Sequence, residues 1–76
     1  MKLVIVTPQN SSTIDNVDIV TLPGSEGKFT VLRRHAPLVS AISKGVIRYN
    51  QNEIAMESGV VEVKDDIITV ITETIV

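Results

Sequence analysis

Short segments in which apolar and polar residues alternate constrain this chain more than any other feature. Val61 and Val63 alternate with Glu62 and Lys64, which is the two-residue repeat of a strand with one face in solvent. Residues branched at Cβ suit this conformation, and the chain has 12 Val, 10 Ile and 7 Thr against only 3 Ala and 4 Leu. The sequence therefore predicts an all-β protein.

Turn-forming sequences divide the chain into short elements. Clusters such as Pro23–Gly27 and Asn50–Asn52 recur at intervals of roughly 8–12 residues, a spacing typical of a sandwich or barrel. Asp65-Asp66 tolerates the positive φ of a tight hairpin, and Asn50–Asn52 suits a slightly longer one. Pro37 interrupts the nearest candidate for a helix, residues 31–42. We expect eight strands, at Lys2–Val6, Val17–Leu22, Phe29–Leu32, Leu38–Ile42, Val46–Asn50, Glu53–Glu57, Val60–Lys64 and Ile67–Thr72.

Length and charge exclude several classes of function. A chain of 76 residues with 43% hydrophobic and 21% charged residues fits a single folded domain, 1–76. Such a domain buries only about 60% of its unfolded surface, so we expect a partner to complete it. A net charge of −2 opposes nucleic-acid binding, and the lack of cysteine favours an intracellular protein. The longest apolar run, Leu3–Val6, is far shorter than the ~20 residues that span a membrane.

Motifs that resemble catalytic or ligand sites depart from the patterns that the chemistry needs. Gly24-Ser25-Glu26-Gly27-Lys28 has two residues between its glycines, whereas a phosphate-binding P-loop has four and opens a helix. His35 is the single histidine, no spacing of metal ligands is evident, and aromatic residues form only 3% of the chain. We therefore expect a protein that is not an enzyme and that holds no metal or cofactor.

A basic segment, Arg33-Arg34-His35-Ala36-Pro37-Leu38, stands out in this acidic chain. Pro37 favours an extended conformation for the residue before it. The side chains of Arg33, Arg34 and His35, which can carry positive charge, therefore precede a stretch of restricted backbone. Two interpretations remain open, a solvated connector between strands and a docking element for a protein partner.

Four segments together resemble one family of proteins. They are Leu22-Pro23-Gly24-Ser25-Glu26-Gly27, His35-Ala36-Pro37-Leu38-Val39-Ser40, Gly45-Val46-Ile47-Arg48 and Ser58-Gly59-Val60-Val61-Glu62-Val63. In register from Lys2 to about Glu73, the chain resembles the N-terminal β-sandwich domain of the epsilon subunits of F-type ATP synthase. Gly-Ser-Glu-Gly followed eight residues later by His-Ala-Pro-Leu is a specific combination.

The resemblance implies a flattened sandwich of two antiparallel sheets with about 8–10 short strands. It implies a non-catalytic rotor subunit of the central stalk, which couples the membrane c-ring to the gamma subunit during ion-driven ATP synthesis. We then expect the protein at the cytoplasmic face of a bacterial inner membrane, held there by its partners and not by lipid. Met1 runs directly into the first strand without an Arg-rich leader, which favours a bacterial or plastid-encoded protein over an imported precursor.

The resemblance also implies which residues contact partners. The loop Ser25–Lys28 matches the family's loop that faces the c-ring, while His35 and Ser40 match positions near the gamma subunit. Together with the rest of the basic segment, the residues expected at partner contacts are Ser25, Glu26, Gly27, Lys28, Arg33, Arg34, His35, Ala36, Pro37, Leu38 and Ser40.

Two features depart from the family's pattern. Arg33-Arg34 stands where members usually have Pro-Gly or a similar pair, and we expect these arginines to meet acidic or carbonyl groups on the ring loops or on gamma. Members commonly continue into a C-terminal helical hairpin that can inhibit ATP hydrolysis and sometimes binds ATP, whereas this sequence ends at Val76. We therefore expect the coupling and assembly role and make no claim of inhibition or ATP sensing.

An alternative from a different class is a free-standing β-sandwich module that binds a small ligand or carbohydrate. A small molecule would stabilise such a module, whereas the gamma subunit would stabilise a stalk subunit, since anything that binds only the native state opposes unfolding.

Overall fold

The computed structural model describes residues 1–75, and these fold into strands joined by short turns. The strands are β1 (Lys2–Val6), β2 (Ser11–Ile14), β3 (Ile19–Gly24), β4 (Gly27–Leu32), β5 (Leu38–Ile42), β6 (Gly45–Tyr49), β7 (Asn52–Met56), β8 (Gly59–Lys64) and β9 (Ile67–Thr72). Residues 1–75 contain no helix, and so none that could span a membrane. The prediction of an all-β protein is confirmed.

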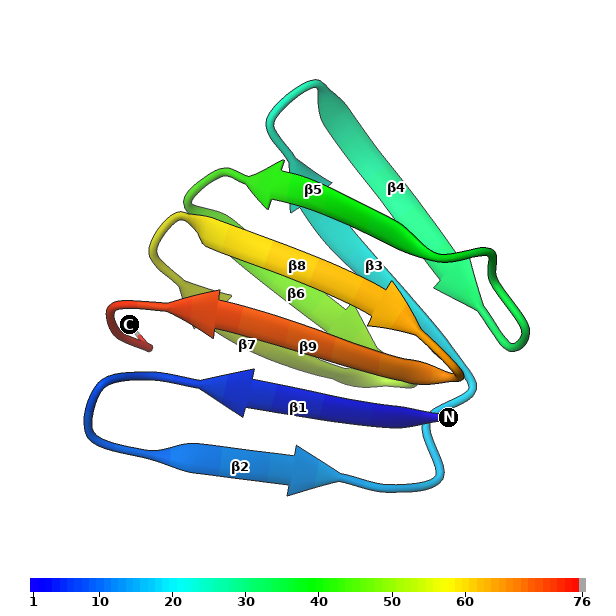
Figure 1. The fold of residues 1–76 in the computed structure, drawn as a ribbon. Coiled ribbons are helices and arrows are strands. Elements are labelled where there is room, and N and C mark those ends of the chain that lie inside the picture. Colours follow the sequence, from blue (N-terminus) through cyan, green and yellow to red (C-terminus); the bar gives the residue numbers. More distant parts are fainter. Residues whose placement is uncertain (76) are drawn as a thin grey trace.

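The strands form one hydrogen-bonded sheet that curls until its two halves face each other (Figure 1). One half has the strand order β2-β1-β9-β8-β5, and the other contains β3, β4, β6 and β7. Among the named strands, one ladder pair, Gly24 in β3 with Ile42 in β5, connects the halves, and an isolated bridge joins Met56 of β7 to Ile75. The structure therefore links into one curled sheet the strands that the resemblance assigned to two sheets of a sandwich.

The pairing of β1 with β9 is parallel, which corrects the prediction of purely antiparallel sheets. The two strands pair from Lys2 opposite Ile67 to Val6 opposite Ile71. Period-two alternation fixes which face of a strand is buried, and it is satisfied equally well by a parallel or an antiparallel neighbour. The direction of this pairing could not be read from the alternation.

Alternation along the strands places one face of each half in a shared apolar core. In β8, Val61 and Val63 are buried, whereas Val60, Glu62 and Lys64 are exposed. Full burial of an aliphatic side chain contributes about 1.5–3 kcal/mol, so this core is the main source of stability. The buried apolar residues are Leu3, Ile5, Val17, Val20, Leu22, Val31, Ile42, Ile47, Met56, Val61, Val63, Ile68 and Val70.

Two hairpins test the predicted turns. Asp65 and Asp66 both have positive φ, 53° and 61°, and they join β8 to β9 in the tight hairpin that the sequence predicts. The hairpin between β6 and β7 is shorter than expected, because Tyr49 pairs with Asn52 and leaves only two residues in the turn. Asn50 makes this possible by adopting a φ of 52°.

Strand β2 was not predicted. Ser11 and Ser12 were assigned to a turn, but Ser11–Ile14 pairs with β1 along its full length, with Ile14 opposite Leu3. This strand lies at the edge of the sheet, and Ser11–Thr13 are exposed on both faces. Polar side chains on a short edge strand discourage pairing with other chains, and they also remove the apolar alternation that identifies strands. The other predicted bounds differ from the observed ones by two residues or fewer.

Gly59 opens β8 where the backbone of β9 comes very close. A Cβ at this position would lie 2.0 Å from the carbonyl oxygen of Ile71. We predict that Gly59→Ala lowers the free energy of unfolding by about 3 kcal/mol, because the two central strands must separate. Chemical denaturation measures this loss.

Gly27→Ala is the matched control. Its φ of 125° makes alanine unfavourable, but no atom lies within 4 Å of a Cβ there, so the expected loss is only about 1 kcal/mol. Equal losses for the two variants would contradict the close approach at Gly59.

Candidate functional site

The basic segment forms the connection from β4 to β5, at one end of the molecule (Figure 1). The guanidinium of Arg33 forms an ion pair with the carboxylate of Asp18. Both side chains are about two-thirds exposed, so this pair adds little stability. Arg33 thus meets a carboxylate of its own chain, and the contact of the two arginines with acidic or carbonyl groups of the ring loops or of gamma stays a prediction.

Arg34 and His35 are held through the backbone. Arg34 has a φ of 63°, and its backbone N–H donates to Oδ1 of Asp66 at 2.6 Å. The backbone N–H of His35 donates to the carbonyl of Leu32 at 3.2 Å. His35 Nδ1 lies 2.7 Å from the carbonyl oxygen of Ala36, which can only accept, so Nδ1 carries the proton. The half-buried imidazole is thereby fixed beside an exposed connection.

Leu38 and Ser40 belong to β5 and face the core side of the sheet. They pair with Val63 and Val61, which are buried, and both are half-buried themselves. Ala36 and Pro37 are exposed in the connection before the strand. The predicted segment is thus divided between an exposed connection and a strand whose Leu38 packs against the core.

The loop Ser25–Lys28 lies at the other end of β4. Ser25 and Glu26 form a two-residue turn between β3 and β4, and the backbone N–H of Ser25 donates to the carbonyl of Ala41 at 3.2 Å. All four residues of the loop are exposed. The structure therefore places Ser25–Lys28 and Arg33–Pro37 at opposite ends of β4, whereas Leu38 and Ser40 lie in β5 (Figure 1).

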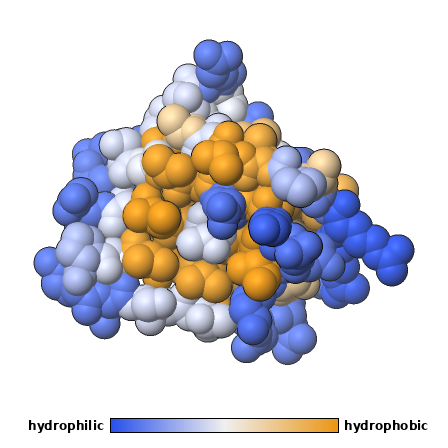
Figure 2. Space-filling view, in the orientation of Figure 1, coloured by the Kyte–Doolittle hydropathy of each residue, from blue (hydrophilic) through white to orange (hydrophobic). Residues whose placement is uncertain are grey.

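A third surface was not predicted, and it lies on the outer side of β1, β5, β8 and β9. Figure 2 shows apolar side chains gathered on this face, in the orientation that places these strands in front in Figure 1. Val39 is 69% exposed, Ile71 52% and Val60 43%. We call this surface the outer apolar face, and its members are Val4, Val6, Val39, Ala41, Val60, Ile67 and Ile71.

Strand register aligns these residues in rows. Ala41 pairs with Val60, Val60 with Ile71, and Ile71 with Val6, so one apolar row crosses four strands. Directly paired residues project from the same side of a sheet, which makes the row continuous. Contiguous apolar surface of this kind marks an interaction site in a soluble protein.

The sequence did contain a signal for this face. Val60-Val61, Ile67-Ile68 and Val70-Ile71 place apolar residues on both sides of their strands. A strand with one face in solvent would carry polar residues at alternate positions, so consecutive apolar residues indicate that both faces are covered.

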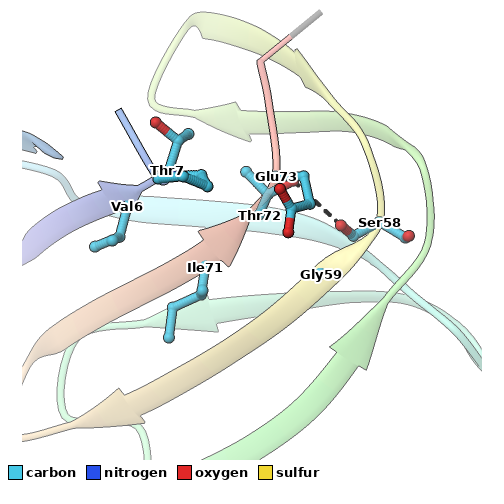
Figure 3. A pocket seen from close by; sticks show the side chains of 8 residues that line it. Val6, Thr7, Ser58, Gly59, Ile71, Thr72 and Glu73 are labelled. Carbon is cyan, nitrogen blue, oxygen red and sulfur yellow. Dashed lines mark hydrogen bonds between the residues drawn. The ribbon is translucent and has the colours of Figure 1, made fainter. Parts of the chain in front are cut away.

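A hollow of about 400 Å³ lies at one end of the outer apolar face. Figure 3 shows its lining, in which Val6 and Ile71 belong to the face and Thr72 and Ser58 lie at the rim. The hydroxyl of Thr72 is within reach of the carbonyl of Ser58, at 3.1 Å. A largely apolar hollow beside an apolar face suits a side chain of a protein partner. No group of three metal-ligating side chains occurs within the described part of the chain.

The side chain of Asn50 connects the β6–β7 turn to residues 16–18, at the end of the molecule that carries Arg33. Its Oδ1 accepts from the backbone N–H of Asp18 at 2.8 Å, and its Nδ2 donates to the carbonyl of Asn16 at 3.2 Å. We predict that Asn50→Ala lowers the free energy of unfolding by about 2–3 kcal/mol, since it removes two hydrogen bonds and places alanine at positive φ. Denaturant unfolding measures the loss.

Asn50→Gly separates the two causes, because glycine accepts the positive φ and removes only the hydrogen bonds. We expect Asn50→Gly to lower the free energy of unfolding by about 1 kcal/mol less than Asn50→Ala does. A glycine variant as unstable as the alanine variant would show that backbone conformation contributes nothing at this turn.

The chain matches a family model described as the β-sandwich domain of the ATP synthase delta/epsilon chain, over residues 1–76. It is 40% identical over 74 residues to the ATP synthase epsilon chain of Desulfitobacterium hafniense, covering 92% of this chain and 56% of that one. It is 45% identical over 78 residues to the epsilon chain of a Sulfurovum species, covering 96% and 61% respectively. The chain thus spans little more than half the length of these relatives.

Two solved structures have a similar fold. A chain in the central stalk and c-ring structure of the Tetrahymena thermophila mitochondrial ATP synthase matches with a TM-score of 0.86 at 13% identity, over 100% of this chain and 65% of that chain. A chain in a Euglena gracilis mitochondrial ATP synthase structure matches with a TM-score of 0.85 at 18% identity, over 97% and 51%. These TM-scores show that the fold is shared, and at such low identity the likeness shows the fold alone.

Proposed function

Because the chain belongs to the ATP synthase delta/epsilon family through its β-sandwich domain, we propose that it is a non-catalytic rotor subunit of the ATP synthase central stalk. In this role it couples the membrane c-ring to the gamma subunit during ion-driven ATP synthesis. The two halves of the curled sheet serve as the two layers of the family's sandwich. The protein works at the cytoplasmic face of a bacterial membrane, where its partners hold it.

The observation that carries this proposal is the outer apolar face. Val39, Val60 and Ile71 expose between 43% and 69% of their surface to solvent on one continuous face. Covering such a surface with a protein partner removes apolar area from water, which is the main driving force of association. A free-standing ligand module has no need of an uncovered flat face of this kind.

The predicted contact residues fit two different partners. Ser25–Lys28 and Arg33–Pro37 lie at opposite ends of β4, so one small partner surface does not span both with ease. We assign the first loop to the c-ring and the second to gamma, as the family resemblance implies. The outer apolar face continues from the second segment, since Val39 directly follows Leu38, and we assign it to gamma as well.

The fold suits the transmission of torque. Each central strand is hydrogen-bonded to neighbours on both sides, so force applied to one loop is distributed over the sheet. An adaptor of this kind needs stiffness and specific surfaces and requires no reactive side chain.

Thermal unfolding with and without gamma tests the proposal against the ligand-binding alternative. We predict that purified gamma subunit at about 100 times its dissociation constant raises the melting temperature of this chain by about 10 °C or more. Serum albumin at the same concentration serves as the control. No shift with gamma, or a shift with a small sugar instead, would contradict the rotor assignment.

A charge reversal tests the basic segment. We predict that replacing Arg33 and Arg34 together by Glu weakens assembly with gamma at least about tenfold, because charges that meet acidic or carbonyl groups are inverted. Pull-down of the assembled stalk measures the loss.

Asp18→Ala is the matched control for this reversal. It breaks the Arg33–Asp18 ion pair inside the chain and leaves both arginines in place, so assembly should be unchanged. If the double variant assembles and couples normally, the two arginines do not belong to the interface.

A further inference from the structure

Glu62 lies within the outer apolar face. It pairs with Val39 of β5 on one side and with Thr69 of β9 on the other, and Val60 precedes it on the same side of β8. The row on one side of Glu62 contains Ala41, Val60 and Ile71, and the row on the other side contains Lys64 and Ile67. Figure 2 shows that hydrophilic residues adjoin the hydrophobic ones on this face.

The carboxylate of Glu62 forms no ion pair or side-chain hydrogen bond within residues 1–75. The acidic groups that do form ion pairs there are Asp15, Asp18, Glu53 and Glu57. Lys64 follows on the same side of β8 but makes no ion pair with Glu62, and Lys2 across the sheet is paired with Asp15. Water therefore solvates Glu62 in the free chain.

A partner that covers this face takes the carboxylate out of water. An ionised carboxylate that is buried without a partner is strongly unfavourable, whereas one that receives charge-assisted hydrogen bonds is stable. A docking partner with a purely apolar surface would therefore be opposed by Glu62 at the position where the contact is otherwise most favourable.

We propose that Glu62 forms a buried ion pair with an arginine or lysine side chain that gamma presents to the outer apolar face. This inference rests on the proposed function, because it takes gamma as the occupant of that face. The pair fixes one orientation, since apolar contact alone is non-directional and permits sliding along the rows of valine and isoleucine. Glu62 is thus the residue that determines the register of docking.

The experiment compares Glu62→Gln with Glu53→Gln in binding to purified gamma, measured by calorimetry. Both substitutions remove one negative charge from an exposed strand position, but Glu53 lies on β7 in the other half of the sheet. We expect Glu62→Gln to weaken binding at least about tenfold and Glu53→Gln to change it less than about twofold. Unchanged or tighter binding by Glu62→Gln would overturn the ion pair, because an unpaired buried carboxylate is relieved by neutralisation.

A second variant separates this inference from the proposed function. Val60→Asn adds a polar group to the same face without touching the core, and we expect it to weaken gamma binding as well. If Val60→Asn weakens binding and Glu62→Gln does not, gamma occupies the face but the ion pair is wrong. If the unaltered chain binds gamma and neither variant matters, gamma docks elsewhere and the inference fails. If the unaltered chain does not bind gamma, the proposed function fails and the inference fails with it.

Discussion

Burial of aliphatic side chains between the two halves of one curled sheet is the interaction on which the rest of the molecule depends. The named strands of the two halves share one ladder pair, Gly24 with Ile42, and a few backbone bonds lie at their margins, so side-chain packing is the main interaction that holds them face to face. The inner side of β8 and β9 contributes Val61, Ile68 and Val70 to this packing. With one side of these strands committed to the core, the other side is free to serve as a flat binding surface.

The surfaces that this arrangement creates differ in chemistry. The two ends of β4 carry polar and charged loops, in which backbone hydrogen bonds fix residues such as Arg34 and His35. The outer side of β1, β5, β8 and β9 is apolar except for Glu62 and Thr69 near its middle and the lysines at one end. An adaptor between two larger bodies needs this combination, because loops supply orientation and an apolar face supplies affinity.

Features that depend on neighbouring residues in the sequence could be predicted from local patterns. Alternation and turn chemistry predicted the all-β class, the Asp65-Asp66 hairpin and strands such as Lys2–Val6 with their observed bounds. The pairing of β1 with β9 joins residues more than 60 positions apart, and no local pattern specifies its direction. The outer apolar face had a local signal in pairs such as Val60-Val61, but its continuity could not be predicted, since Ala41, Val60 and Ile71 form a row only once the register of three strands is known. The contact loops came from family resemblance and could not have been derived from spacing.

The parallel pairing of β1 with β9 also determines when the edge of β1 can be covered during synthesis. Strand β1 has β2 as its only early neighbour, and its other edge stays open until β9 has been made. Long-range pairing of this type forms slowly, because a large loop must close before any contact is gained. The open edge of β1 is therefore exposed while β2 to β9 are made, and a chaperone or an early-arriving partner subunit would protect it during that time.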